Sequence, residues 1–196
     1  MSQQSTTSRP LVLADAWPLT RAHDAILVAL YACFIGLTAQ VSIPLPFTPV
    51  PITGQTFGVL AGALALGSQR SGLGVLLYLA VGLLGVPWFA QGQSGIGTLH
   101  LPTVGYLVGF VPAALLAGRL AETGLYRSPW GAFATMAVCS AAVYLFGVSG
   151  LMLTLGWSLA QAVAQGVLPF LFGDAVKALL AAVALPGAAR LITPPR

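Results

Sequence analysis

Asp174 and Lys177 stand three positions apart in a strongly apolar stretch, PFLFGDAVKALLAAV (169–183). A charged side chain costs about 2.5–3.5 kcal/mol at the centre of a lipid-facing helix on insertion scales. The spacing puts both on one helix face, where they can form an ion pair that only neutralises itself. Replacing such a buried pair by apolar residues is often neutral or stabilising. The sequence therefore favours a polar ligand site, in which the carboxylate accepts N–H donors and the ammonium meets a carbonyl or carboxylate.

The composition predicts a membrane protein around this pair. Of 196 residues, 57% are hydrophobic and only 6% are charged, which is too little charge for a soluble chain. Helices are expected rather than a barrel, because no ten-residue alternating strands are present. We predict an all-α integral membrane protein, a compact bundle of six transmembrane helices. The predicted spans are 24–43, 53–67, 72–86, 103–120, 130–153 and 168–185.

The bundle is expected to form one domain. We predict a cytoplasmic N-terminal segment (1–23), a transmembrane domain (24–186) and a cytoplasmic C-terminal tail (187–196). The segment 154–166 is less apolar and carries two glutamines, so the sequence leaves open whether it is an interfacial helix or extends a neighbouring span. The first residues lack the pattern of a cleaved signal peptide.

The basic residues predict the orientation. With six spans, all seven arginines fall on one side, and the connections after the first, third and fifth spans contain no Lys or Arg. The positive-inside rule then places both termini in the cytoplasm and the chain in the cell membrane as a multi-pass protein. The formal charge of +4 is thus a topology signal and predicts no nucleic-acid partner. The arginines are Arg9, Arg21, Arg70, Arg119, Arg127, Arg190 and Arg196, with Asp15, Asp24 and Glu122 expected as solvated neighbours.

Two connections on the other side are rich in Pro, Gly, Thr and Gln: SIPLPFTPVPITGQ (42–55) and WFAQGQSGIGTLHLPTVGY (88–106). Proline favours extended backbone, and glycine allows close approach to a ligand. We predict that they cover a pocket, although ordinary turns are the alternative. Cys33 and Cys139 lie in apolar runs without metal-ligand spacing, so they are expected as small buried hydrophobic residues, and no metal site is predicted.

Four segments in this order carry a family resemblance: PVPITGQTFGVLAGALALG (49–67), YLAVGLLGVPWFA (78–90), LPTVGYLVGF (101–110) and PFLFGDAVKALLA (169–181). Together they resemble the BioY family, the biotin-binding membrane component of energy-coupling-factor transporters. The resemblance implies six helices, a pocket near the outer face that binds biotin, and no cofactor, biotin being the transported ligand. It also implies that Asp174 and Lys177, in the Gly-Asp-x-x-Lys motif, take part in binding.

The chemistry of biotin fits the residues available. Asp174 can accept from the ureido N–H groups, Lys177 can serve a carbonyl or the carboxylate, and Gln55 can donate and accept. Aromatic side chains suit the apolar ring. The predicted contact residues are Asp174, Lys177, Gln55, Tyr78, Phe89, Gln93, Thr103 and Tyr106.

The chain departs from the family pattern in two places. Where the family often has Gly-Pro-Thr-Gly-Gly-Tyr, this chain has LPTVGY, with Leu101 and Val104 in place of glycines. The glycine-rich loop carries Gln91 and Gln93 and no arginine. Lys177 and Gln93 are therefore the candidates to meet the biotin carboxylate.

No energy source is visible in the chain. It has no G-x-x-x-x-G-K-[ST] motif, and Lys177 is its only lysine. ATP-driven uptake would require a coupling subunit and two ATPase subunits as separate chains, and self-association is the alternative. Small residues on one helix face allow close approach of another helix. Ala25, Ala29, Ala32 and Gly36 form such a stripe, which predicts a coupling-subunit contact or, equally, packing within the bundle.

Two other protein classes are alternatives for this sequence. GVSG (147–150) resembles the Ser motif of an intramembrane protease, but a serine nucleophile needs a base. That class places its histidine on a later helix, and His23 and His100 both precede Ser149. A channel or structural membrane protein is the other alternative, and saturable binding of a small ligand would distinguish it from a transporter. We expect no enzymatic activity.

Overall fold

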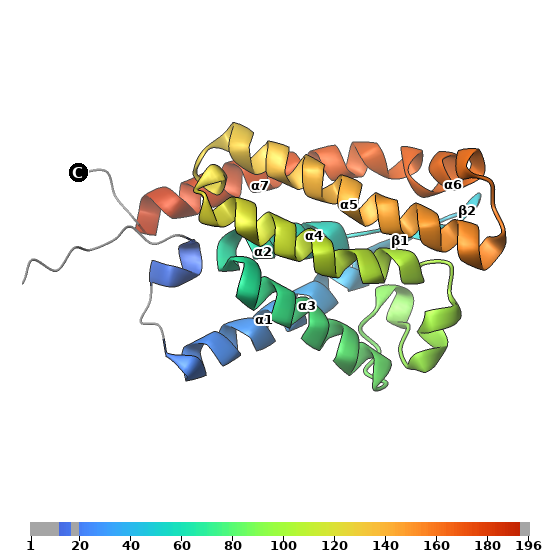
Figure 1. Cartoon of the computed structure of the whole chain (residues 1–196), viewed down its shortest axis with the longest axis horizontal. Helices are drawn as coiled ribbons and strands as arrows, with labels where there is room; N and C mark the ends of the chain where they lie inside the picture. Colours follow the sequence, from blue (N-terminus) through green and yellow to red (C-terminus); the bar gives the residue numbers. More distant parts are fainter. Residues whose placement is uncertain (1–11, 17–19, 193–196) are drawn as a thin grey trace, which may run out of the picture.

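The chain forms an elongated helical bundle with a small hairpin at one end (Figure 1). The computed structural model describes residues 12–16 and 20–192. The α-helices in this part of the chain are α1 (Arg21–Gln40), α2 (Gln55–Leu66), α3 (Ser68–Leu83), α4 (Val104–Glu122), α5 (Pro129–Leu155), α6 (Leu159–Gly166) and α7 (Leu171–Ile192). The strands are β1 (Ser42–Leu45) and β2 (Thr48–Thr53), and the 3-10 helices are η1 (Leu13–Ala16), η2 (Ala90–Gly92), η3 (Ile96–His100), η4 (Leu125–Arg127) and η5 (Leu168–Phe170).

Four stretches of the described chain are long and apolar enough to cross a membrane. They are Arg21–Gln40, Val104–Glu122, Pro129–Leu155 and Leu159–Leu191. They agree with four of the predicted spans to within a few residues, apart from α6, which precedes α7 in the last stretch. The segment 154–166, which the sequence left open, contains this short separate helix. Ser158 and Gln161 form a capping box at its start.

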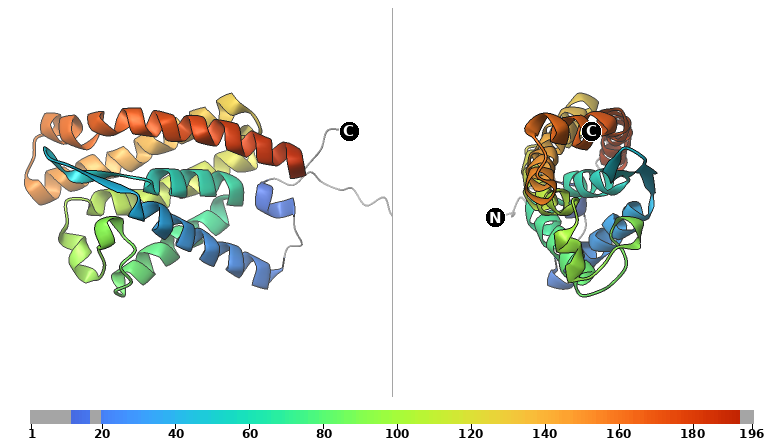
Figure 2. Two further views of the ribbon diagram at one scale, coloured as in Figure 1. Left: turned by 180° about the vertical axis from the view of Figure 1, so that it is seen from behind. Right: turned by 90° about the vertical axis from the view of Figure 1, so that its right-hand side faces the viewer.

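The predicted second span is not a full crossing helix. α2 has 12 residues and therefore rises only about 18 Å, whereas the hydrocarbon core is about 30 Å thick. The β1–β2 hairpin continues along the bundle from the start of α2 (Figures 1 and 2). The fold is mostly helical, as predicted, but the connection between α1 and α2 adds two short strands. Four prolines between residues 44 and 51 exclude a helix, and the segment pairs antiparallel instead, with Ile43 opposite Ile52.

Two further boundaries differ from the sequence prediction. The connection between α2 and α3 is a single residue, Gly67, whose φ of 82° suits glycine. Glu122 at the end of α4 accepts hydrogen bonds from the Ser68 backbone N–H (2.7 Å) and hydroxyl (2.8 Å), which caps the start of α3. α7 runs through Pro186 to Ile192, beyond the predicted end of the last span.

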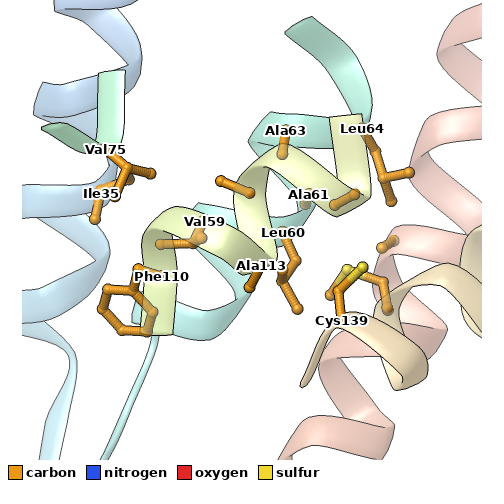
Figure 3. Close-up of a cluster of buried hydrophobic side chains, with 14 of the residues drawn as sticks. Ile35, Val59, Leu60, Ala61, Ala63, Leu64, Val75, Phe110, Ala113 and Cys139 are labelled. Carbon is orange, nitrogen blue, oxygen red and sulfur yellow. The ribbon is translucent and has the colours of Figure 1, made fainter. Parts of the chain in front are cut away.

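The core of the bundle is centred on α2, which lies among the other helices (Figure 3). Leu60 and Leu64 are fully buried there, with Ile35 of α1 and Val75 of α3 in the same cluster. Cys139 is buried as predicted, but Cys33 is exposed, so the expectation for Cys33 is wrong. The face of α1 that carries Cys33 points away from the core.

The arginines that the structure describes gather at one end of the bundle. α1 and α3 begin there, and α4 and α7 end there (Figure 1). Arg70 in the first turn of α3 bridges Asp15 and Asp24, each at 2.8 Å, so these carboxylates are ion-paired rather than merely solvated. Arg9 and Arg196 lie outside the described residues. The charge asymmetry of the sequence is thus an asymmetry along the bundle axis.

Candidate ligand-binding site

A pocket is lined by residues from the starts of α4 and α7, from the hairpin and from α2. These helices begin at the end of the bundle opposite the arginines (Figure 1). Segments far apart in the sequence supply its walls, so the full fold is needed to form it. Its lining residues are Val50, Pro51, Thr53, Gln55, Thr56, Phe89, Ala90, Gln93, Thr98, Leu101, Thr103, Tyr106, Leu107, Phe110, Tyr144, Phe170, Asp174 and Lys177.

Asp174 and Lys177 form an ion pair in the wall of this pocket. Lys177 Nζ lies 2.8 Å from Asp174 Oδ1, and the two side chains are 17% and 10% exposed. Asp174 is in the first turn of α7, where the helix dipole favours a carboxylate. The pair therefore lies near one end of a helix and faces a pocket, so the cost of a charge at the centre of a lipid-facing helix does not apply to it.

Two residues from other helices complete this polar cluster. Thr56 of α2 donates to Asp174 Oδ1 (3.0 Å) and accepts from Lys177 Nζ (2.7 Å). Tyr144 of α5 donates a hydrogen bond to Asp174 Oδ2. A carboxylate can accept about four hydrogen bonds, and Asp174 has three donors among the described residues. It therefore retains capacity for a further N–H donor.

Gln55, at the start of α2, is held by neighbours on both ends of its amide. Its Nε2 donates to the Tyr78 hydroxyl (2.7 Å), and its Oε1 accepts from Thr53 (3.2 Å). Tyr78 is fully buried. Its ring packs edge-on against Phe89, with centroids 5.2 Å apart. Tyr78 thus orients one polar and one apolar residue of the pocket without lining it.

The remaining walls are aromatic or neutral. Phe89, Phe110, Tyr106 and Phe170 supply apolar surface. Gly82 leaves room for Phe89, since a Cβ at Gly82 would collide with its ring. The Tyr106 hydroxyl donates to the Gly166 carbonyl (2.7 Å), which ties α4 to the end of α6.

The structure brings together most residues that the sequence singled out. The predicted residues that line the pocket are Asp174, Lys177, Gln55, Phe89, Gln93, Thr103 and Tyr106. Tyr78 does not line the pocket but contacts the lining residues Gln55 and Phe89 from behind. That these residues contact a ligand stays a prediction. Both loops expected to cover a pocket contribute to its lining.

Sequence reasoning missed Thr56, Thr98 and Tyr144. Thr56 follows Gln55 directly, and this neighbouring position is a signal in the sequence that could have identified it. Tyr144 lies in a continuous apolar helix and carries no sequence signal. Ser149 donates to the Leu145 carbonyl of its own helix (2.8 Å), an ordinary helical contact for a serine.

The small-residue stripe on α1 divides into two halves. Ala25 and Ala29 are exposed, whereas Ala32 and Gly36 are buried within the bundle. A Cβ at Gly36 would lie 3.0 Å from the Trp88 ring. Internal packing therefore accounts for Ala32 and Gly36, and a coupling-subunit contact stays a prediction for Ala25 and Ala29 alone.

Comparison with known proteins gives a consistent result. Residues 5–194 match the BioY family. The chain is 34% identical over 171 residues to a protein of Rhizobium etli named Biotin transporter BioY, covering 82% of this chain and 90% of that protein. It is 33% identical over 162 residues to the Biotin transporter BioY of Thermotoga maritima, covering 82% and 92%.

A solved structure shares the fold. It is the S-component for biotin from an ECF-type ABC transporter, with a TM-score of 0.76 and 26% sequence identity over 89% of this chain and 94% of that chain. The family match covers nearly the whole length and the solved structure shares the fold, so the chain belongs to the BioY family.

Proposed function

We propose that this protein takes up biotin across the cell membrane as the substrate-binding component of an ECF-type transporter. The observation that carries the proposal is a single carboxylate–ammonium pair, Asp174 and Lys177, in a pocket whose other walls are aromatic or neutral. Biotin has matching parts: a ureido group with two N–H donors and a carbonyl, and an apolar fused ring. The relatives named as biotin transporters support the same substrate.

Each wall of the pocket has a role in this proposal. Asp174 accepts a ureido N–H at its remaining acceptor position, and Lys177 donates to the ureido carbonyl from its place beside Thr56. Gln55 supplies an amide that donates or accepts. Phe89 and Tyr106 pack against the apolar ring system, as aromatic side chains do in small-molecule sites.

The orientation and partners follow from the charge distribution and the family. The arginine-rich end faces the cytoplasm under the positive-inside rule, so the pocket opens to the outside. Biotin uptake then depends on a transmembrane coupling subunit and two ATPase subunits, or on self-association. Ala25 and Ala29 offer exposed small side chains on α1 for close contact with a partner helix.

Two measurements test the proposal. Native mass spectrometry of protein extracted in detergent should show bound biotin, because a tight binder retains its ligand. Cells that lack their own biotin uptake should accumulate labelled biotin when they produce this chain, with and without an ATPase module as separate arms. No bound biotin and no saturable binding would contradict the proposal and favour the channel or structural alternative.

A further inference from the structure

The pocket has no net charge. Among its described lining residues, only Asp174 and Lys177 carry a formal charge, and they lie 2.8 Å apart. Lys177 also donates to Thr56 at 2.7 Å. The ammonium is therefore already compensated by a carboxylate. Within the described part of the chain, the pocket lining offers no second cation that could balance the negative charge of an entering ligand.

The wall that faces this pair is neutral. It comes from the connection between α3 and α4, which lies on the opposite side of the bundle from α7 (Figures 1 and 2). Gln93, Thr98 and Thr103 are its polar side chains in the pocket. His100 in the same connection is exposed and is not among the lining residues. An amide and two hydroxyls are thus what this wall offers to the far end of a ligand.

Thr98 is the residue of this wall whose side-chain hydroxyl lacks a hydrogen-bond partner among the described residues. Its side chain lines the pocket and is 3% exposed. Its Oγ1 is buried and has no hydrogen-bond partner within the described part of the chain. Its backbone is fully used, because its N–H donates to Gly95 and its carbonyl accepts from Leu101, both at 3.1 Å. A buried hydroxyl without a partner is unfavourable, and a ligand group in the pocket can supply that partner.

A hydroxyl can form hydrogen bonds with charged and with neutral groups, whereas a cation binds an anion more strongly than a neutral group. It donates to the oxygen of a carboxylate, an ester or an amide, and it accepts from an amide N–H. A carboxylate that enters a pocket without a compensating cation loses hydration that a neutral amide or ester loses to a lesser degree. A neutral wall therefore gives a free acid little advantage over its neutral derivatives.

We infer that this protein binds biotin whose carboxyl group is amidated or esterified as well as it binds free biotin, with Thr98 as the hydrogen-bonding partner of the tail. The inference rests on the proposed function and extends its substrate class to carboxyl-modified biotin. Gln93 and Thr103 complete the neutral wall. Lys177 serves the ureido end of the ligand and takes no part in recognising the tail.

The first test compares three ligands on the purified full chain by isothermal titration calorimetry in detergent: biotin, biotinamide and biotin methyl ester. The affinities should agree within about threefold, since no charge-assisted bond to the tail is present to be lost. If both neutral ligands bind at least about tenfold more weakly than biotin, the inference is overturned and the proposed function stands. If none of the three binds, the proposed function fails and the inference fails with it.

A second test adds the missing charge. Gln93→Arg places a cation in the pocket wall. It should raise the ratio of biotin affinity to biotinamide affinity by about tenfold, because a charge-assisted hydrogen bond to the carboxylate is gained. Gln91→Arg is the matched control, because Gln91 lies in the same connection and is exposed, as Gln93 is, but does not line the pocket. It should leave the ratio near its wild-type value. An unchanged ratio in Gln93→Arg would show that the tail does not lie at this wall.

A third test isolates the hydroxyl of Thr98. Thr98→Val should weaken biotin and biotinamide alike, by about three- to tenfold, because one neutral hydrogen bond is lost. The same change should raise the melting temperature of the protein without ligand, since an unpaired buried hydroxyl is removed. Thr98→Ser, which keeps the hydroxyl, should restore binding. Wild-type affinity in a stable Thr98→Val protein would overturn the role of Thr98.

Discussion

The ammonium of Lys177 lies 2.8 Å from Oδ1 of Asp174, one helical turn earlier on α7. This contact alone is what a self-neutralising ion pair would show. The surroundings distinguish the site from such a pair, because Thr56 and Tyr144 reach the same carboxylate from two other helices. Side chains from α2, α5 and α7 thus converge on one acceptor at the wall of a pocket.

The Asp174 carboxylate should be required for biotin binding. Asp174→Asn keeps the shape but replaces an anionic acceptor by an amide, so charge-assisted hydrogen bonds worth about 1.5–3 kcal/mol are lost. We expect biotin affinity to fall roughly ten- to a hundredfold in calorimetry. Lys177→Met should weaken biotin and biotin methyl ester alike, because the lysine serves the ureido end.

The double variant Asp174→Leu, Lys177→Met decides between the two interpretations of the pair. It removes both charges together, so a purely structural ion pair could be replaced without harm. A well-folded double variant that binds biotin normally would refute the site assignment.

The contact between α4 and α5 should be sensitive to a single methyl group. Gly105 of α4 faces Gly150 of α5, and a Cβ at Gly105 would lie 2.9 Å from the Gly150 Cα and against the Phe146 carbonyl. Gly105→Ala should cost about 1–3 kcal/mol by overpacking and lower the midpoint of thermal unfolding. Because these helices carry Tyr106 and Tyr144, biotin affinity should fall as well.

Gly97→Ala is the control for this change. A Cβ at Gly97 meets nothing within 4 Å, so its unfolding midpoint should match that of the wild type. Equal midpoints for both variants would mean that the helices separate easily at this contact.

The orientation can be tested by cysteine labelling in whole cells. The background should lack Cys33, which is exposed, and Cys139. In it, Gln69→Cys at the arginine-rich end should react only with membrane-permeant reagents. Ile96→Cys, which is 69% exposed in the wild type, should react with impermeant reagents too. Impermeant labelling at Gln69→Cys would reverse the proposed orientation.

The exposed half of the α1 stripe should affect partner association and not ligand binding. Ala25→Leu and Ala29→Leu add bulk on a surface that is open in this chain, so co-purification with a coupling subunit should weaken while biotin affinity is unchanged. Ala32→Leu is the contrasting variant. Ala32 is 1% exposed, so this change should destabilise the isolated protein. Reduced ligand affinity in Ala25→Leu would mean that this half also packs internally.

The sequence alone predicted a mostly helical, strongly apolar protein and a candidate ligand site within it. Apolar run length predicted the helices that became α1, α4, α5 and α7, because crossing a bilayer fixes both length and composition. The position of the arginines predicted one charged end. Two charges in an apolar run marked Asp174 and Lys177 as candidate site residues, since a charged side chain in a membrane-spanning segment is energetically unfavourable and usually functional.

The tertiary structure alone decided how the ends of the predicted spans are built and which residues meet. Prolines excluded a helix at residues 44–51, but that this segment pairs as a hairpin beside a short α2 depends on what covers it. Tyr144 is indistinguishable in sequence from a lipid-facing or core aromatic residue, and only the rotation of α5 against α7 turns it toward Asp174. Likewise, Ala25 and Ala32 share one stripe in sequence, yet one is exposed and the other buried. The reason is physical: run length and composition are local properties of a chain, whereas the face that a helix buries is set by its neighbours.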